Sequence, residues 1–389
     1  MLGIGTFAVH SLNYAYHIIA ARRLNAIDYG ELSTLLALFM ILSVASQVLQ
    51  TTVTRHWTDI SATHPLRARG IITHKSLIFS WYFLLIGAAL IPFLCYFLGL
   101  SSGSLIITFI AGGAAILLGS LRGILQGSNN IQSLSANLSL ESFIKVITLI
   151  AFLYFGLTVN AGVGAILLSI VLSIFTLSPK FQHTKHAQLP ENFTHAAHSC
   201  LGFILLFTLM YNGDQLLVRA FLPDNSADFG VISRLSQLTL FGSVMLTTIW
   251  FSRMNSSNTQ ANAEQNKTET HLTFMLIIVG IIASMTLWYF FGTPIITLIF
   301  GENYAHIAPL LPLHALNMGL LGIIYFLCHG FLLKNSRAFL APFTFGLLLF
   351  IILITLFHAS LSMILWMIFL SLAVTLILLS VVYKRQNAQ

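Results

Sequence analysis

The chain has 389 residues, of which 57% are hydrophobic and only 7% are charged, and its mean hydropathy is +0.88. An average soluble domain has roughly 25% charged residues, so this composition excludes an ordinary soluble globule. The formal charge of +7 at pH 7 does not indicate a nucleic-acid-binding protein, because the basic residues lie beside apolar segments, where anionic lipid headgroups are the expected neighbours.

Apolar segments long enough to cross a bilayer recur along the whole sequence, separated by short polar gaps. A transmembrane helix needs about 20 apolar residues, whereas transmembrane strands alternate apolar and polar residues over about ten positions. Because stretches such as 105–118 are apolar on all sides, we predict an all-α integral membrane protein with about 12 transmembrane helices. The predicted spans are residues 2–20, 31–53, 76–99, 104–126, 132–156, 161–178, 200–221, 231–251, 272–291, 307–332, 338–357 and 361–382.

The distribution of Lys and Arg predicts the orientation, because short positively charged loops stay on the cytoplasmic side. Thirteen of the 18 residues lie in or beside loops that follow even-numbered spans, or in the C-terminal tail. We therefore expect both termini to be cytoplasmic. The residues beside odd-numbered loops are expected near the outer rim of a substrate cavity and are Arg22, Arg23, Arg219 and Arg234.

Span 1 carries His10 and His17, which are seven residues apart and lie on nearly one helix face beside Asn13 and Tyr14. A membrane His usually makes an interhelical hydrogen bond, although two on one face also fit the wall of a polar cavity. Asn13 and His17 are therefore candidate cavity residues.

Span 4 carries a small residue at every fourth position, which forms a flat stripe along one side of the helix. Such a stripe lets a neighbouring backbone approach closely, either as static packing or as a sliding surface. The stripe consists of Ala111, Ala115, Gly119, Gly123 and Gly127.

Span 5 carries two ionisable residues near the middle of the bilayer, Glu141 and Lys145. Charges at this depth are costly and must face a partner or a watery cavity. The two residues are one helical turn apart. They either neutralise each other as an ion pair or form a polar cavity wall that contacts substrate.

Residues 179–199 form a polar, His-rich linker, which divides the chain into predicted six-helix bundles at 1–178 and 200–389. Two H-x-x-H units in the linker offer imidazoles, but such spacing without Cys or a carboxylate cluster is weak evidence for zinc, so we expect no metal site. No nucleotide-binding loop or hydrolase motif is present, so we expect no cofactor and no enzymatic activity. The four linker histidines are His183, His186, His195 and His198.

A repeat joins span 1 to span 7. Residues 18–24, followed by Asp28-Tyr29-Gly30, are matched by residues 216–222, followed by Asp228-Phe229-Gly230. Because each half contains an even number of spans, the halves enter the membrane in the same direction and are parallel repeats about an axis along the membrane normal. This arrangement predicts two bundles around a central cavity.

Span 7 carries Asp214, which we place in the outer half of the bilayer, flanked by Asn212 and Gln215 and at the level of Arg219 and Arg234. A carboxylate at this depth is either one half of a structural ion pair or a site that binds a cation, a proton or substrate. Asp214 is therefore both a cavity residue and the candidate for coupling transport to H⁺ or Na⁺.

Four local patterns resemble the polysaccharide flippases of the multidrug/oligosaccharidyl-lipid/polysaccharide exporter superfamily. Their order and spacing extend along nearly the whole chain. They are Ala21-Arg22-Arg23-Leu24 with Asp28-Tyr29-Gly30, Arg122-Gly123-Ile124-Leu125-Gln126-Gly127, Asn212-Gly213-Asp214-Gln215-Leu216-Leu217-Val218, and Phe300-Gly301-Glu302-Asn303-Tyr304.

The resemblance implies a flippase for a lipid-linked oligosaccharide, in which two rocking bundles pass the headgroup outward while the lipid tail stays in the bilayer. A glycan polymerase is a partner that this function would imply. A sugar crossing hydrocarbon would lose its hydrogen bonds at a cost of several kcal/mol for each hydroxyl, so a polar, closable cavity is required.

Two other functions remain open. A cation-coupled multidrug exporter of the same superfamily would also use an acidic ion site, and Asp214 fits either function. A membrane-embedded glycan polymerase or ligase would be an enzyme and would need a sizeable external loop with catalytic Arg and His, whereas the predicted external loops are short.

Overall fold

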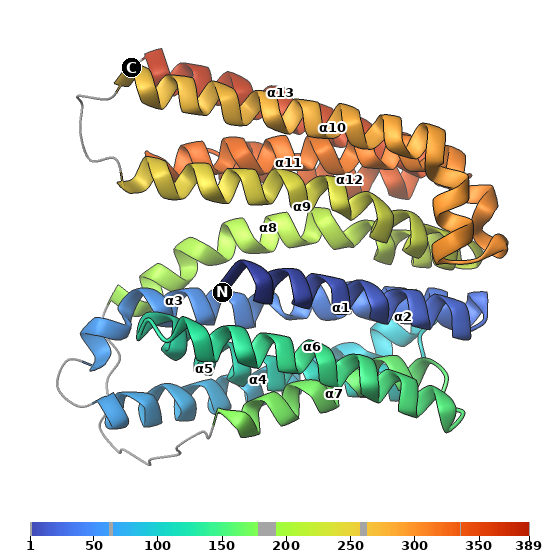
Figure 1. Cartoon of the computed structure of the whole chain (residues 1–389), viewed down its shortest axis with the longest axis horizontal. Coiled ribbons are helices and arrows are strands. Elements are labelled where there is room, and N and C mark those ends of the chain that lie inside the picture. The colour runs from blue at the N-terminus through green and yellow to red at the C-terminus, as the bar shows by residue number, and fades with distance from the viewer. Residues whose placement is uncertain (1, 62–64, 178–191, 257–262, 335, 389) are drawn as a thin grey trace. The chain divides into compact units, whose positions relative to one another are not determined.

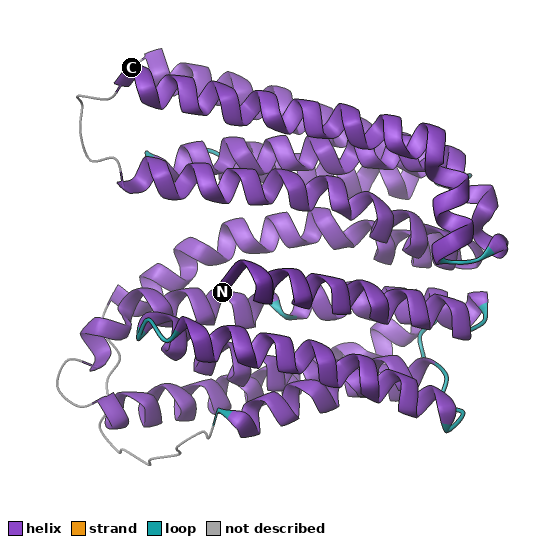
Figure 2. Cartoon of the chain, in the orientation of Figure 1, coloured by secondary structure: helices purple, strands orange, loops and turns teal. Residues whose placement is uncertain are grey.

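The computed structural model describes residues 2–61, 65–177, 192–256, 263–334 and 336–388, and within these ranges the chain is helical and has no strand (Figures 1 and 2). The all-α prediction is therefore confirmed. The helices are α1 (Leu2–Arg23), α2 (Ala26–Leu42), α3 (Val44–Ser61), α4 (Pro65–Leu98), α5 (Ser102–Gly127), α6 (Ile131–Tyr154), α7 (Val159–Thr176), α8 (Asn192–Phe221), α9 (Ser226–Ser256), α10 (Ala263–Ile299), α11 (Leu311–Leu333), α12 (Leu340–Leu356) and α13 (Leu361–Ala388), with short 3₁₀ helices η1 (Pro223–Asn225) and η3 (Glu302–Leu310).

Ten segments of the described chain are long and apolar enough to cross a bilayer. The predicted span 31–53 is divided between α2 and α3, because the regular helix is interrupted at Ser43, whose hydroxyl donates to the Met40 carbonyl at 2.8 Å. The ten do not include α12, which is apolar but has 17 residues, or α1. The helix α1 carries polar residues such as His10 and Asn13 along its length.

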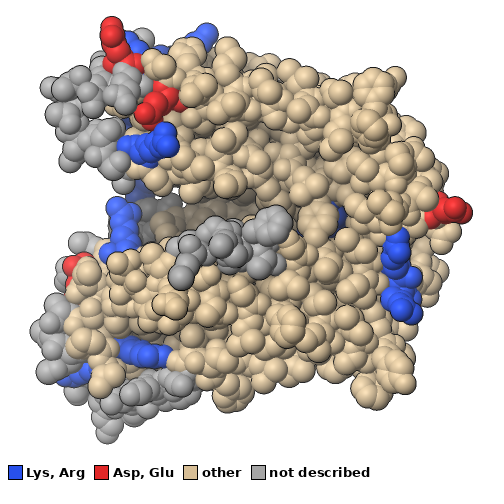
Figure 3. Space-filling model, viewed as in Figure 1, with Lys and Arg blue, Asp and Glu red and all other residues tan. Residues whose placement is uncertain are grey.

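Large apolar side chains cover the outside of the helices, as expected for a protein whose solvent is lipid. On α4, Trp81 and Tyr82 are each 62% exposed, and on α10 Tyr289 is 74% exposed. On the face shown in Figure 3, nearly all the charged side chains lie at the ends of the helices and uncharged surface covers their middle. The chain is a multi-pass membrane protein.

The chain divides into two compact units, which we call unit 1 (Met1–Thr208) and unit 2 (Leu209–Gln389). The division falls within α8, whereas we predicted bundles that end at residue 178 and begin again at residue 200. Most of the predicted linker, residues 179–191, lies outside the described residues. The predicted domain boundaries therefore stay a prediction.

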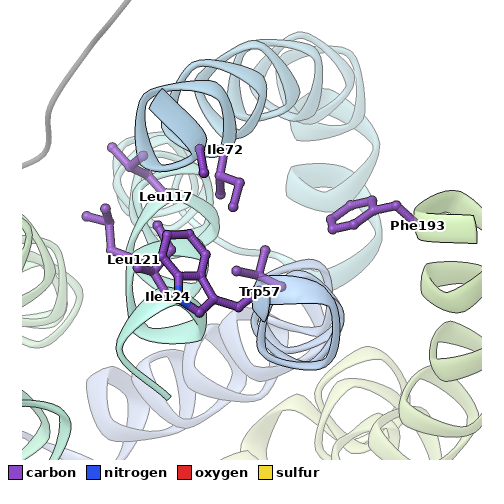
Figure 4. Packing of buried hydrophobic residues seen from close by; sticks show 8 residues of the cluster. Trp57, Ile72, Leu117, Leu121, Ile124 and Phe193 are labelled. Atoms are coloured by element: carbon purple, nitrogen blue, oxygen red, sulfur yellow. The ribbon is translucent and has the colours of Figure 1, made fainter. Parts of the chain in front are cut away.

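Unit 1 is organised around α5, which packs against α3, α4 and α7. Its core includes Trp57 of α3, Ile72 of α4 and Leu121 of α5, and it extends to Phe193 at the start of α8 (Figure 4). The first residues of α8 therefore pack with the helices of unit 1, although α8 ends in unit 2.

The small-residue stripe of span 4 lies against α3. A Cβ added at Gly123 would stand 2.7 Å from the Gln50 carbonyl oxygen and 2.9 Å from the Val53 Cβ. The Ser46 hydroxyl donates across the same interface to the Ala115 carbonyl at 2.7 Å. The stripe is therefore a site of close backbone packing, as one of the two interpretations predicted.

A glycine also allows close helix packing in unit 2, where Gly322 of α11 faces the Ser243 side chain of α9. A cluster of buried apolar residues that includes Trp250, Ile281 and Phe326 joins α9, α10 and α11. On the other side of α11, the Asn317 amide donates to the Leu365 carbonyl of α13 at 2.9 Å. The helix α11 is thereby fixed at the centre of its unit.

Candidate transport sites

A polar network joins α5, α6 and α7 inside unit 1. The Arg122 guanidinium forms an ion pair with the Glu141 carboxylate, and its Nε donates to the Asn137 Oδ1 at 2.8 Å. The Asn137 amide then donates to the Ser173 carbonyl and to the Thr176 hydroxyl, each at 3.0 Å. Glu141 of α6 therefore forms its ion pair with Arg122 of α5. One of the two interpretations of the sequence had paired it with Lys145 on its own helix.

Lys145, one turn after Glu141, faces α1. Its ammonium group donates to the Asn13 Oδ1 and lies 5.3 Å from the centroid of the Tyr16 ring. Asn13 and Lys145, which we predicted separately as cavity residues, are thus brought together. The amide oxygen and the aromatic face both stabilise an ammonium group at membrane depth.

The other candidates on α1 lie along the same helix. His17 is half-buried and its ring packs edge-on against Tyr16, with 5.5 Å between the ring centroids. Arg22 and Arg23 are exposed in the last turn of α1, where positive charge is favourable to the helix dipole. Their predicted place at an outer rim of a cavity stays a prediction.

Unit 2 contains a carboxylate that is almost completely buried. Asp214 of α8 is 1% exposed; its Oδ1 accepts from the Gln215 backbone N–H at 2.8 Å, and its Oδ2 has no hydrogen-bond partner among the described residues. That oxygen lies 3.9 Å from the His314 Nε2 of α11. This separation is beyond hydrogen-bond distance, so the two groups face each other without a direct hydrogen bond.

His314 is 0% exposed, and neither of its ring nitrogens has a hydrogen-bond partner among the described residues. The ring packs against Phe229 of α9, with 5.3 Å between the centroids. A buried carboxylate oxygen beside an unpartnered imidazole can take up a proton or a small cation, because either would supply the missing interaction.

The polar residues that flank Asp214 hold α8 against α9. The Gln215 amide donates to the carbonyl and to the hydroxyl of Ser226, at 3.0 and 3.1 Å. Asn212 is buried, and Arg219 is buried in the last turn of α8. Arg234 of α9 donates to the Gln237 Oε1 at 3.0 Å and interacts electrostatically with Asp214.

Sequence reasoning missed two of the residues that complete these sites, Arg122 and His314. Arg122 stands in one of the four resembling patterns, but we counted it only as a basic residue at the end of a span. His314 lies within the predicted span 307–332, and an ionisable residue at that depth is itself a signal for function. Asn317 follows it by three residues, so both lie on one side of α11.

No group of three or more potential metal ligands occurs in the part of the chain that the structure describes. Of the linker histidines, His183 and His186 lie outside the described residues, and so does the side chain of His195. His198 is exposed on α8.

The fold is similar to those of several solved structures of transporters. An inward-facing multidrug resistance MATE family transporter matches with a TM-score of 0.80 and 13% identity, over 97% of this chain and 94% of that chain. The lipid II flippase MurJ, in an inward closed conformation, matches with a TM-score of 0.78 and 15% identity, over 98% of this chain and 87% of that one. A MOP superfamily transporter from Pyrococcus furiosus matches with a TM-score of 0.68 and 14% identity, over 100% and 94%.

The sequence matches no protein-family profile and no curated protein sequence. At these identities the structural likeness shows the fold.

Proposed function

We propose that this chain is a flippase that moves a lipid-linked oligosaccharide across the bacterial inner membrane by alternating access, with both termini in the cytoplasm. The observation that carries the proposal is the fold, which is similar over nearly its whole length to that of a lipid II flippase. The four sequence patterns point to the oligosaccharide-lipid branch of the same superfamily.

The polar groups inside the helices suit such a cargo. An oligosaccharide needs hydrogen-bond partners to replace water. Unit 1 offers Asn13, His17, Glu141 and Lys145 as candidates for this role, and unit 2 offers Asp214. The four arginines, Arg22, Arg23, Arg219 and Arg234, would hold the cargo's phosphate or sugar groups at the rim.

A flipping assay tests the proposal directly. Full-length protein in liposomes should expose a fluorescent polyprenyl-diphosphate oligosaccharide to a membrane-impermeant quencher faster than protein-free liposomes do. In cells, deletion of the gene should trap the lipid-linked oligosaccharide on the cytoplasmic side. Unchanged surface glycan in the deletion strain, together with no flipping in liposomes, would refute the proposal.

A cation-coupled multidrug exporter is the second candidate. Two observations favour it: the likeness to a multidrug resistance MATE transporter, and the buried carboxylate Asp214 beside His314. This function predicts efflux of an amphipathic cation dye from liposomes that receive the protein, with no flipping of the glycolipid. The two assays on one preparation therefore separate the candidates.

Either cargo could be driven by H⁺ or Na⁺ through Asp214. We expect Asp214→Asn to abolish the dependence of transport on an imposed ion gradient and to slow transport at least tenfold, because the amide cannot bind or release a proton and carries no charge to attract sodium. Glu141→Asp, which keeps a carboxylate in unit 1, should leave the gradient dependence intact. Full gradient-driven transport by Asp214→Asn would remove Asp214 from the coupling step.

A further inference from the structure

Unit 1 contains an apolar groove that the proposed transport function does not use. It lies among α3, α4 and the first half of α8, with the end of α2 beside them, and has a volume of about 610 Å³. Pockets that bind small molecules typically measure roughly 300–1,000 Å³. Apolar residues that line it include Ala45, Leu49, Phe79, Phe83, Leu201 and Leu205.

One end of the groove is polar. Lys75 of α4 lines this end, one turn before Phe79 and two turns before Phe83. The helix rises about 12 Å from Lys75 to Phe83. On α8, His198 lines it in the same way, before Leu201 and Leu205. The groove therefore has a cationic end just before the predicted apolar spans 76–99 and 200–221, and an apolar floor within them.

The Lys75 charge has no acidic complement among the residues that the structure describes. Its side chain is exposed, and no carboxylate among the described residues forms an ion pair with it. The acidic residue at the end of α3, Asp59, faces His56 instead, at 3.6 Å. A free ammonium group at the mouth of an apolar groove is complementary to a ligand with an anionic head and a hydrocarbon chain.

We propose that this groove binds one anionic phospholipid of the bilayer, with its phosphate at Lys75 and an acyl chain along Phe79, Phe83 and Leu205. The bilayer supplies such lipids in large excess, and the floor of the groove lies at the depth of their chains. The bound lipid contacts α8 as well as α3 and α4, so it stabilises the first half of α8 on unit 1.

Photolabelling of the purified full-length protein tests this site. Two phospholipids that carry the same photoreactive acyl chain are compared, phosphatidylglycerol and the zwitterionic phosphatidylcholine, and the labelled peptides are mapped by mass spectrometry. We expect phosphatidylglycerol to label segments 41–49, 76–83 and 201–205 several-fold more strongly than phosphatidylcholine does.

Lys75→Gln should lower the phosphatidylglycerol labelling about fivefold, the effect of one basic residue on binding to an anionic membrane surface. Lys384→Gln, which removes an exposed lysine of α13 outside the groove, should leave the labelling unchanged. Because Lys75 is exposed, its substitution does not disturb the core.

Ala45→Trp should fill the groove and abolish the labelling of its floor by both lipids, while size-exclusion chromatography reports whether the variant is folded. The proposal is overturned if the two lipids label the groove equally, or if Lys75→Gln is labelled as strongly as Lys384→Gln. Either result would leave the proposed transport of glycolipid untouched, because the flipping assay does not depend on this site.

Discussion

The two units differ in whether the ionisable residues among their helices have hydrogen-bond partners within the protein. In unit 1, Arg122 and Glu141 pair across α5 and α6, and their side chains keep 11% and 20% of their exposure. In unit 2, the Asp214 and His314 side chains are 1% and 0% exposed and face each other at 3.9 Å. The unit 1 pair is satisfied by the protein itself, whereas the unit 2 pair leaves hydrogen-bonding capacity for something else.

This difference assigns separate tasks to the units. A satisfied pair holds helices together in every conformation, because opening it would leave a charge without a partner. An unsatisfied carboxylate and imidazole can gain an interaction by binding a proton or cation and lose it again on release. We therefore infer that the Arg122–Glu141 pair holds α5 and α6 together and that the unit 2 pair responds to ions.

The largest expected effect comes from breaking the unit 1 pair. Arg122→Ala should lower the free energy of unfolding by about 3 kcal/mol, the lower end of the range for breaking a buried pair, because both side chains retain some exposure. The result is measured as the Tm of the purified protein in detergent.

The double variant Arg122→Met/Glu141→Leu removes both charges and should regain most of the lost stability, since apolar residues of similar volume can replace such a pair. Transport by this variant should still depend on an imposed ion gradient, although loss of the Glu141 carboxylate can slow the passage of cargo. A double variant that is stable but uncoupled would give unit 1 a role in ion coupling and break the proposed division of tasks.

A smaller loss of stability is expected at the glycine-mediated helix contacts that both units contain, α3 with α5 and α9 with α11. Gly123→Leu should cost about 2 kcal/mol, because its side chain would enter the space of Gln50 and Val53 on α3. Gly322→Leu in unit 2 should cost a similar amount against Ser243. Gly280→Leu is the matched control, because no described atom lies within 4 Å of its added Cβ; equal Tm values for all three would contradict the packing argument.

Much of the fold could be predicted because length and apolarity decide which segments enter the bilayer. The predicted span 104–126 is α5 with its ends shifted by one or two residues, and the spacing of Gly119, Gly123 and Gly127 predicted a tight interface. The interruption between α2 and α3 was not predicted, because residues 42–44 contain neither Gly nor Pro.

The candidate sites were predicted less completely because partners depend on which helices become neighbours. The sequence offered Lys145 as the nearest partner for Glu141, but α6 packs against α1 and α7 and also contacts α5, and these helices supply Asn13, Arg122 and other polar groups. Asp214 was evident from its charge alone. His314 is about 100 residues away in sequence, and only the fold brings it to Asp214.

The smallest expected effect is that of replacing one carboxylate by an amide in each unit. The resulting change in the free energy of unfolding should have opposite signs in the two units. Asp214→Asn should raise the free energy of unfolding by up to about 1 kcal/mol, since a buried carboxylate oxygen without a partner is costly and an amide of the same shape carries no charge. Glu141→Gln, the same chemical change in unit 1, should lower it, because Arg122 would lose its counter-charge. If both substitutions lower the Tm equally, Asp214 is also a structural partner, of Arg234, which interacts with it electrostatically. The functional distinction between the two units would then fail.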